Sequence, residues 1–413
     1  LRGLQFINDL PVELVDFDGI KEIITRELDE QITEELDSNY SEMYALLGLL
    51  PENSSLRDMY QSMIEEQAAG LYDPGDKKFY VVDIDIGSAI GNMLGFEGAF
   101  GDFASGFLEG FLGGMGLDMQ STIIVHELTH ALDDQHFDIE ATMEYLLTAE
   151  SDDMQLAYQS LLEGSATKTM NDYVFSKMGV DTSVAQNLAG NADANIALTE
   201  GMMDYPALLK RIMVAPYLKG EEFVRYLHKE GGHEAVDNAF RNPPTSMEQI
   251  YNPADFIRSR DIPSVIEDPD MQSALPGWKK QASNTLGILL IGLMFEMSMN
   301  DKDYGDKIAS GWDGDRITIW KSPHGDMAFA WCTTWDSADD AMEFYDAYLD
   351  FLDARFPSGT WATNWNGQAV YLFTGTASGI EIDGRDVVIV ERVPENRVNA
   401  CIEELWKTPI VYK

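Results

Sequence analysis

Shortages of cysteine and of basic residues each exclude a class of protein. Only Cys332 and Cys401 occur in 413 residues, too few for a disulfide scaffold, although a single Cys332–Cys401 bridge would suit a protein outside the cytosol. Lys and Arg number 28 against 71 Asp and Glu, so the formal net charge is −43. Nucleic acid and anionic lipid surfaces are bound through clustered cations, and both are therefore excluded as partners.

Long apolar runs are missing as well. No uninterrupted run of about 20 apolar residues occurs, so we expect no membrane-spanning helix. The chain opens at Leu1 with neither a basic stretch nor an apolar signal core. Two locations fit these features. One is extracellular or on the cell surface, with the signal outside this sequence, and the other is the cytoplasm of a salt-adapted organism.

The residues that are present favour folded domains in a salty medium. Apolar residues make up 45% and aromatic residues 11%, so the chain can fill hydrophobic cores and is not disordered as a whole. The acidic excess makes the compact state repel itself unless salt screens it, which favours a halophilic protein over a merely soluble acidic one. A length of 413 residues favours two domains.

The first 274 residues predict a mainly helical domain with a small sheet. Apolar residues recur at steps of three and four over 19–50 and again over 56–69, as on amphipathic helices. The stretch 78–86 is rich in strand-forming residues. We expect it to be either an edge strand that pairs with an extended peptide or an internal strand of the sheet.

A glycine- and phenylalanine-rich insertion is expected over 87–118. Five phenylalanines between Phe96 and Phe111 are spaced as on one helix face, which favours a buried helix. A lid over a site and a weakly membrane-seeking flap are the alternatives, because the many glycines weaken a helix. Residues 119–240 have a mostly helical pattern, which Asn242-Pro243-Pro244 ends.

The pattern changes near residue 275 and predicts a smaller α+β domain over 275–413, so the fold class is α+β. The expected helices are 282–298, 337–354 and 395–406, and the expected strands are 316–320, 327–335, 368–373 and 386–392. The segment Gly311–Arg316 is rich in glycine and aspartate, and we interpret it as a turn, with a calcium loop as the alternative.

One five-residue motif indicates chemistry. His126-Glu127-Leu128-Thr129-His130 follows three aliphatic residues within a helical pattern. Residues four apart on an α-helix point in similar directions, so both imidazoles can bind one ion with Glu127 beside it. Zn²⁺ is the metal that this arrangement suits. The alternative is a solvated helix face, but the apolar flanks indicate a buried helix, where unpaired polar groups are costly.

Two residues compete to be the third ligand. Glu163 lies on a second apolar helix, where Gly164 and Ala166 are small enough for close helix packing. His136 lies six residues after His130, at the metzincin spacing, but binds only if the chain turns sharply near residue 133. We therefore predict a site of two histidines and one glutamate, with His126, His130 and Glu163 as ligands.

Several blocks of sequence resemble a family of bacterial and archaeal zinc metallopeptidases with a gluzincin-like active site. The blocks are 67–74, 126–137, 163–167, 242–250 and 311–316. The resemblance implies a secreted or surface-associated peptidase, a zincin-like domain over 1–274, the ligands named above and Glu127 as base. Two positions differ from the family pattern: Ser165 replaces a frequent aspartate, and Tyr251-Asn252 replaces Leu-His.

The expected reaction is peptide hydrolysis. Zinc activates water, Glu127 takes its proton as general base, and a further group stabilises the oxyanion. Tyr251 is the leading candidate for that group from its motif position, with His228 and His233 as alternatives. Met247 is interpreted as a packing residue. The competing function is a non-catalytic or autoinhibited acidic metal-binding surface protein, the cleft being closed by the C-terminal domain.

Overall fold

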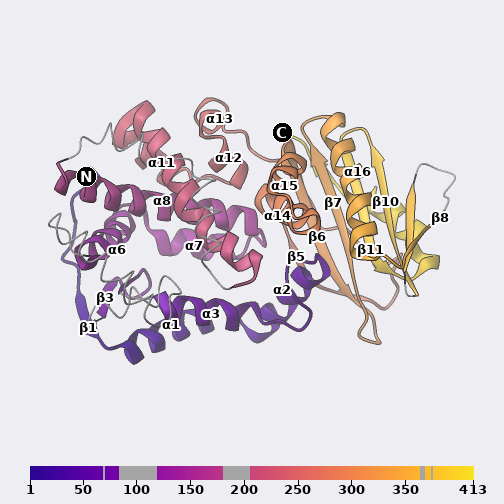
Figure 1. Cartoon of the computed structure of the whole chain (residues 1–413), viewed down its shortest axis with the longest axis horizontal. Coiled ribbons are helices and arrows are strands. Elements are labelled where there is room, and N and C mark those ends of the chain that lie inside the picture. Colours follow the sequence, from indigo (N-terminus) through magenta and orange to yellow (C-terminus); the bar gives the residue numbers. More distant parts are fainter. Residues whose placement is uncertain (68–69, 83–118, 180–204, 363–367, 374) are drawn as a thin grey trace.

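The computed structural model describes residues 1–67, 70–82, 119–179, 205–362, 368–373 and 375–413. It has an α+β fold, as predicted, with a helical N-terminal part beside a large C-terminal sheet (Figure 1). The expected insertion 87–118 lies outside the described residues. No helix among the described residues is long and apolar enough to cross a membrane.

A small sheet lies at the N-terminal end of the molecule. Its strands β1 (Val12–Val15), β3 (Lys78–Val82) and β2 (Gly70–Asp73) are hydrogen-bonded in that order. Strand β3 pairs in parallel with β1 and antiparallel with β2, so both of its edges are used. The predicted strand 78–86 is therefore internal over its described part, and the alternative that it is a peptide-binding edge is wrong.

Helices build the rest of the N-terminal part. The predicted helix 19–50 is two helices, because Thr33 caps a new one by accepting from Leu36 N. The helices are α1 (Phe17–Gln31), α2 (Glu34–Leu46), α3 (Leu56–Gln67), α6 (Met119–Phe137), α7 (Ile139–Leu147), α8 (Asp152–Lys177), α11 (Ala207–Arg241), α12 (Met247–Tyr251) and α13 (Pro253–Arg258). Within α11, Gly231 and Gly232 have non-helical backbone angles and divide the helix.

The C-terminal part is a seven-stranded antiparallel sheet with helices on both faces. Its strand order is β5-β6-β7-β11-β10-β9-β8. The strands are β5 (Lys279–Asn284), β6 (Trp312–Lys321), β7 (Met327–Trp335), β8 (Thr360–Ala362), β9 (Ala369–Phe373), β10 (Thr376–Asp383) and β11 (Asp386–Val393). The helices are α14 (Gly287–Met299), α15 (Lys302–Ala309), α16 (Ala338–Arg355) and α17 (Val398–Leu405), with a short 3₁₀ turn at Glu395–Arg397. Strands β4 (Val265–Ile266) and β12 (Ile410–Val411) pair separately.

Alternate residues of β7 face two different cores, as the pleat of a strand requires. Phe329 and Trp331 belong to a core that also contains α14 and α16, whereas Ala330 and Cys332 face α17. The first core continues into the N-terminal part, where Leu161 of α8 is fully buried in it. The expected domains 1–274 and 275–413 therefore share one hydrophobic core.

Two expectations about the C-terminal part are wrong. Gly311–Arg316 is neither a turn nor a calcium loop, because β6 begins at Trp312. Its buried Asp315 accepts hydrogen bonds from the backbone of Leu286 and Gly287 and from the indoles of Trp312 and Trp331. This side chain therefore joins β6 to β7 and to the start of α14. Cys332 and Cys401 are buried free thiols, so the bridge that the sequence left possible is not formed.

Candidate metal centre

Helix α6 carries His126 and His130 on one face. The helix runs without interruption from Met119 to Phe137, and it packs against α8, α7, β2 and β3. One turn separates the two histidines, so both imidazoles point toward α8. Their side chains are only 11% and 16% exposed, which confirms the expectation of a largely buried site.

Glu163 completes a group of three, and the distances between the ligand atoms fit one metal ion. Glu163 Oε2 lies 3.1 Å from His126 Nε2 and 3.5 Å from His130 Nε2. The two histidine Nε2 atoms are 3.1 Å apart. Zinc bonds of about 2.0–2.1 Å in a tetrahedron place neighbouring ligand atoms about 3.3 Å apart. The three side chains thus have the spacing that a shared zinc ion requires.

The electrostatics of the group couple the Glu163 carboxylate to the two imidazoles. Burial alone would raise the pKa of Glu163, but the two adjacent imidazoles hold it well below its usual range. Burial would lower the pKa of His130, but the Glu163 carboxylate outweighs it and raises that pKa to about 9. The carboxylate is therefore ionised at neutral pH, the state in which it binds a metal, whereas the His130 imidazole carries a proton that a bound metal must displace.

Helix α8 brings Glu163 to this position. Ser151 caps its first turn by accepting from Met154 N, and Asp153 accepts from Met247 N of α12, so the helix start is fixed. Ser165 and Ala166 are fully buried beyond Glu163. Gly164 makes its close contact with Gly220 of α11, whereas the sequence had suggested close packing against α6.

Glu127 lies beside the three ligands and is oriented by a strand. Its Oε2 accepts a hydrogen bond of 2.9 Å from the backbone N–H of Tyr72. Tyr72 belongs to β2, which pairs with β3 on one side only. An edge strand therefore does lie against the metal-centre helix, but it is β2 rather than the predicted strand. No sequence pattern identified this backbone contact.

Tyr217 is a site residue that the sequence did not reveal. Its ring stacks on His126, with centroids 5.9 Å apart and an angle of 16° between the planes. It lies on α11 directly after Pro216, and 37% of it is exposed. No motif marks this tyrosine, because the contact depends on how α11 packs against α8.

A buried aspartate connects the site helices behind the ligands. Asp133 of α6 is fully buried and accepts a hydrogen bond of 2.7 Å from Ser165 Oγ of α8. Arg2 Nε forms an ion pair with the other Asp133 oxygen at 2.7 Å. In this chain the carboxylate behind the site comes from α6, and Ser165 of α8 donates to it.

His136 lies apart from the other two histidines of α6. The helix continues past Asp133, so His136 points away and its Nε2 lies 2.8 Å from the carbonyl oxygen of Gln5. The metzincin alternative for the third ligand fails for this reason.

The three candidate oxyanion groups from the sequence lie on α11 and α12. His228 and His233 contact each other edge to face, with centroids 4.7 Å apart. His228 follows Tyr217 by eleven residues, about 16 Å along a helix. Tyr251 is partly buried on α12 beneath Lys219 Nζ, which is 4.8 Å from its ring centre. Met247 is fully buried, consistent with a packing role.

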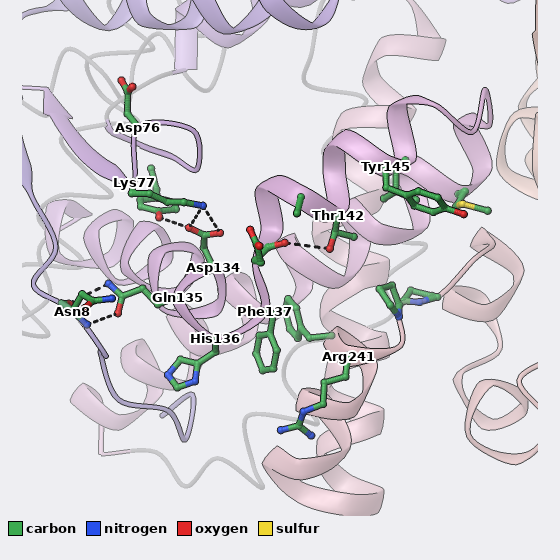
Figure 2. A pocket seen from close by; sticks show the side chains of 18 of the residues that line it. Asn8, Asp76, Lys77, Asp134, Gln135, His136, Phe137, Thr142, Tyr145 and Arg241 are labelled. Carbon is green, nitrogen blue, oxygen red and sulfur yellow. Dashed lines mark hydrogen bonds and ion pairs between the residues drawn. The ribbon is translucent and has the colours of Figure 1, made fainter.

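A cleft of about 1180 Å³ lies near the C-terminal end of α6 (Figure 2). Lys77 and Asp134 form an ion pair of 3.0 Å within it, and Arg241 lies on another part of its wall. The three metal-centre residues do not line this cleft. The cleft and the group of possible metal ligands therefore lie at different places. The spacing of the ligand atoms makes the three-residue group the better candidate site.

Together, the fold and the site define an α+β protein with a candidate metal centre of two histidines and one glutamate. Residues 274–401 match a family described as a domain of unknown function (DUF8575). The matched stretch covers most of the C-terminal sheet and includes neither α6 nor α8. Neither a curated protein nor a solved structure matches the chain.

Proposed function

We propose that the protein is a zinc-dependent peptidase of the gluzincin type, with a zincin-like domain in residues 1–274. The proposal rests on the spacing of the three ligand atoms and on Glu127, which directly follows the ligand His126 on α6. Catalytic zinc sites use three protein ligands and leave one position for water, whereas structural sites use four, often with cysteine. Both cysteines lie in the C-terminal part, in contact with α17 or on it.

The donor set fits zinc, which accepts imidazole nitrogen and carboxylate oxygen. His126, His130 and Glu163 would hold the ion, and the ion would act as a Lewis acid that makes water a stronger nucleophile at neutral pH. Glu127 then removes a proton from the attacking water and returns it to the leaving amine. The Tyr72 N–H keeps the Glu127 carboxylate oriented throughout.

Tyr217 is the tyrosine that the proposal places at the oxyanion. Its ring contacts a metal ligand, which places this tyrosine beside the proposed ion. A hydroxyl donor aimed at the oxyanion stabilises the charge that develops in the transition state. Polypeptide is the expected substrate, and a salt-rich environment outside the cell is the setting that the charge favours.

The competing proposal is a metal-binding surface protein without activity, or a peptidase closed by its own C-terminal domain. The described neighbours of the three ligands lie on α6, α8 and α11. Figure 1 shows α6 on the side of the helical part that faces away from the C-terminal sheet. Closure of the site by that sheet is thus not supported in the described part of the chain.

The Glu127→Gln variant tests the proposal. We expect it to retain zinc, because Glu127 is not a ligand, and to lose cleavage of unfolded casein at both low and high salt. The exposed Glu230→Gln on α11 is the control and should cleave like the wild type. Cleavage that survives in Glu127→Gln would refute Glu127 as the base. A wild-type protein that binds zinc and cleaves nothing would favour the surface-protein function.

A further inference from the structure

Arg2 is buried although it lies in an exposed segment. Its relative exposure is 6%, whereas most of the first nine residues are exposed. The guanidinium lies beside a stacked pair of aromatic rings, with its carbon 5.8 Å from the ring centre of Phe137 and 5.3 Å from that of Phe240. A buried arginine is costly unless its charge is matched, so its ion partners decide what it does.

Those partners join the three helices of the candidate site. Arg2 Nη1 donates to Asp237 of α11 at 2.7 Å, and Arg2 Nε pairs with Asp133 of α6 at 2.7 Å. Asp133 also accepts from Ser165 of α8. One guanidinium and one carboxylate thus connect α6 and α8, which carry the three ligands, with the part of α11 that follows its break at Gly231 and Gly232.

The linkage is close to the ligands on α6 and α8. Asp133 follows His130 by three residues, and Ser165 follows Glu163 by two. A shift of either polar group would therefore move a ligand that is less than one turn away. Without the arginine, the buried carboxylates of Asp133 and Asp237 would lose the cation that they share, and their helices would separate or admit water.

Further bonds fasten the rest of the segment to α6. Gln135 accepts from the backbone N–H groups of Ile7 and Asn8, and its amide donates to the Asn8 carbonyl (Figure 2). His136 contacts the Gln5 carbonyl. The residue that the metzincin spacing suggested as a ligand thus serves as an anchor for the N-terminal segment.

We propose that Arg2 is a positioning residue of the metal centre: the N-terminal segment delivers its guanidinium to Asp133 and Asp237, which fixes the three helices in the arrangement that binds the ion. The inference rests on the proposed function only in taking the three ligands to bind zinc. Because linkage is reciprocal, bound metal must also hold the N-terminal segment more firmly in place.

The full-length Arg2→Met variant tests this role. It should bind zinc about 10- to 100-fold more weakly than the wild type, the loss typical of residues that support metal ligands. With Co²⁺ in place of zinc, its visible absorption bands should also shift, because the ligand geometry changes. Arg2→Lys, which restores the charge, should recover part of the affinity.

Arg26→Met is the matched control. Arg26 also pairs with two aspartates, at 2.7 and 2.8 Å, but its partners lie on β2 and the following turn. It should leave zinc affinity and the Co²⁺ spectrum unchanged. A folded Arg2→Met with wild-type zinc affinity and an unchanged spectrum would overturn the inference while leaving the proposed function intact.

A second measurement holds even if Arg2→Met does not fold. Zinc added to the wild-type protein should slow hydrogen exchange at the amides of Ile7 and Asn8, compared with protein treated with a chelator. Equal exchange with zinc bound would overturn the inference. A wild-type protein that binds no zinc would overturn the proposed function as well.

Discussion

Gly164 and Gly220 face each other so closely that neither position can accept a side chain. A Cβ on Gly164 would lie 2.1 Å from the Gly220 carbonyl oxygen, and one on Gly220 would lie 2.0 Å from the Ser160 carbonyl oxygen. The contact brings the backbones of α8 and α11 together one residue after Glu163. Tyr217 lies less than one turn before Gly220, so this contact sets how Glu163 and Tyr217 are placed relative to each other across the site.

Gly164→Ala should therefore weaken both the fold and the site. The new methyl group meets backbone, which cannot rotate away, so we expect a loss of about 1–3 kcal/mol in the free energy of unfolding. Denaturant unfolding measures this loss, and chelator competition measures the accompanying fall in zinc affinity. Gly292→Ala is the control, because its Cβ would meet only ordinary contacts beyond 3.4 Å, and equal losses at both glycines would contradict the explanation.

Bound zinc should stabilise the protein through Glu163. A ligand present at 100 times its dissociation constant adds about 2.7 kcal/mol to the free energy of unfolding. Glu163→Gln should lose most of this increment, because a neutral amide is a poor zinc ligand. The zinc-dependent increment, and not the free energy of unfolding itself, is the quantity to compare between the variant and the wild type. The free energy of unfolding also changes because the variant loses the contact between Glu163 and His130. His136→Gln should keep the full increment, and a loss there would revive the metzincin arrangement.

The two tyrosines make separable predictions. If Tyr217 donates to the oxyanion, Tyr217→Phe should lower kcat by about 10²–10³ with zinc content unchanged. Tyr251→Phe should leave kcat near the wild-type value, because its ring lies beneath Lys219 and packs against the hydrophobic core, contacts that the phenylalanine ring keeps. Steady-state kinetics on a fluorogenic peptide measures both. The reverse pattern would return the role to the residue that the sequence favoured.

The motif was easier to predict than its surroundings. Spacing alone brought His126 and His130 together, since four residues are about one helical turn, and the small residues near Glu163 marked a closely packed helix. Strand β7 was predicted with its observed bounds, from an apolar run with strand-forming residues. Local patterns can supply these features because they need no knowledge of distant neighbours.

Features that depend on distant contacts were missed. Nothing in the sequence around Tyr217 shows that α11 lies against His126, and nothing near Tyr72 shows that its N–H reaches Glu127. The segment at Gly311–Arg316 contains turn-forming residues, yet it starts a strand because Asp315 binds the backbone before α14. Tertiary hydrogen bonds decided these positions against local preference.

Glu248 should make stability depend on pH. It is 6% exposed, one of its oxygens has no hydrogen-bond partner, and burial raises its pKa from 4.5 to about 8. Between these values the folded state holds a proton that the unfolded state releases, so stability falls as pH rises through 8. Glu248→Gln should remove this fall and be more stable than the wild type at pH 9, by on the order of 1–3 kcal/mol. Thermal unfolding at pH 6 and pH 9 measures the difference.

The control is the exposed Glu230→Gln, which should leave the pH dependence as it is in the wild type. A Glu248→Gln protein that loses stability between pH 6 and pH 9 as steeply as the wild type would show that Glu248 is not the group responsible.

Salt should stabilise the whole molecule. A formal net charge of −43 makes the folded state repel itself, and the Debye length shortens from about 10 Å at 0.1 M to about 3 Å at 1 M salt. The unfolded chain spreads the same charge over a larger volume, so screening favours the folded state. The midpoint of thermal unfolding should therefore rise steadily from 0.1 M to about 2 M KCl and rise similarly in NaCl, since screening depends on ionic strength. A midpoint that is flat across this range would show that ordinary surface ion pairing already balances the acidic excess, and the salt-rich setting would lose its physical basis.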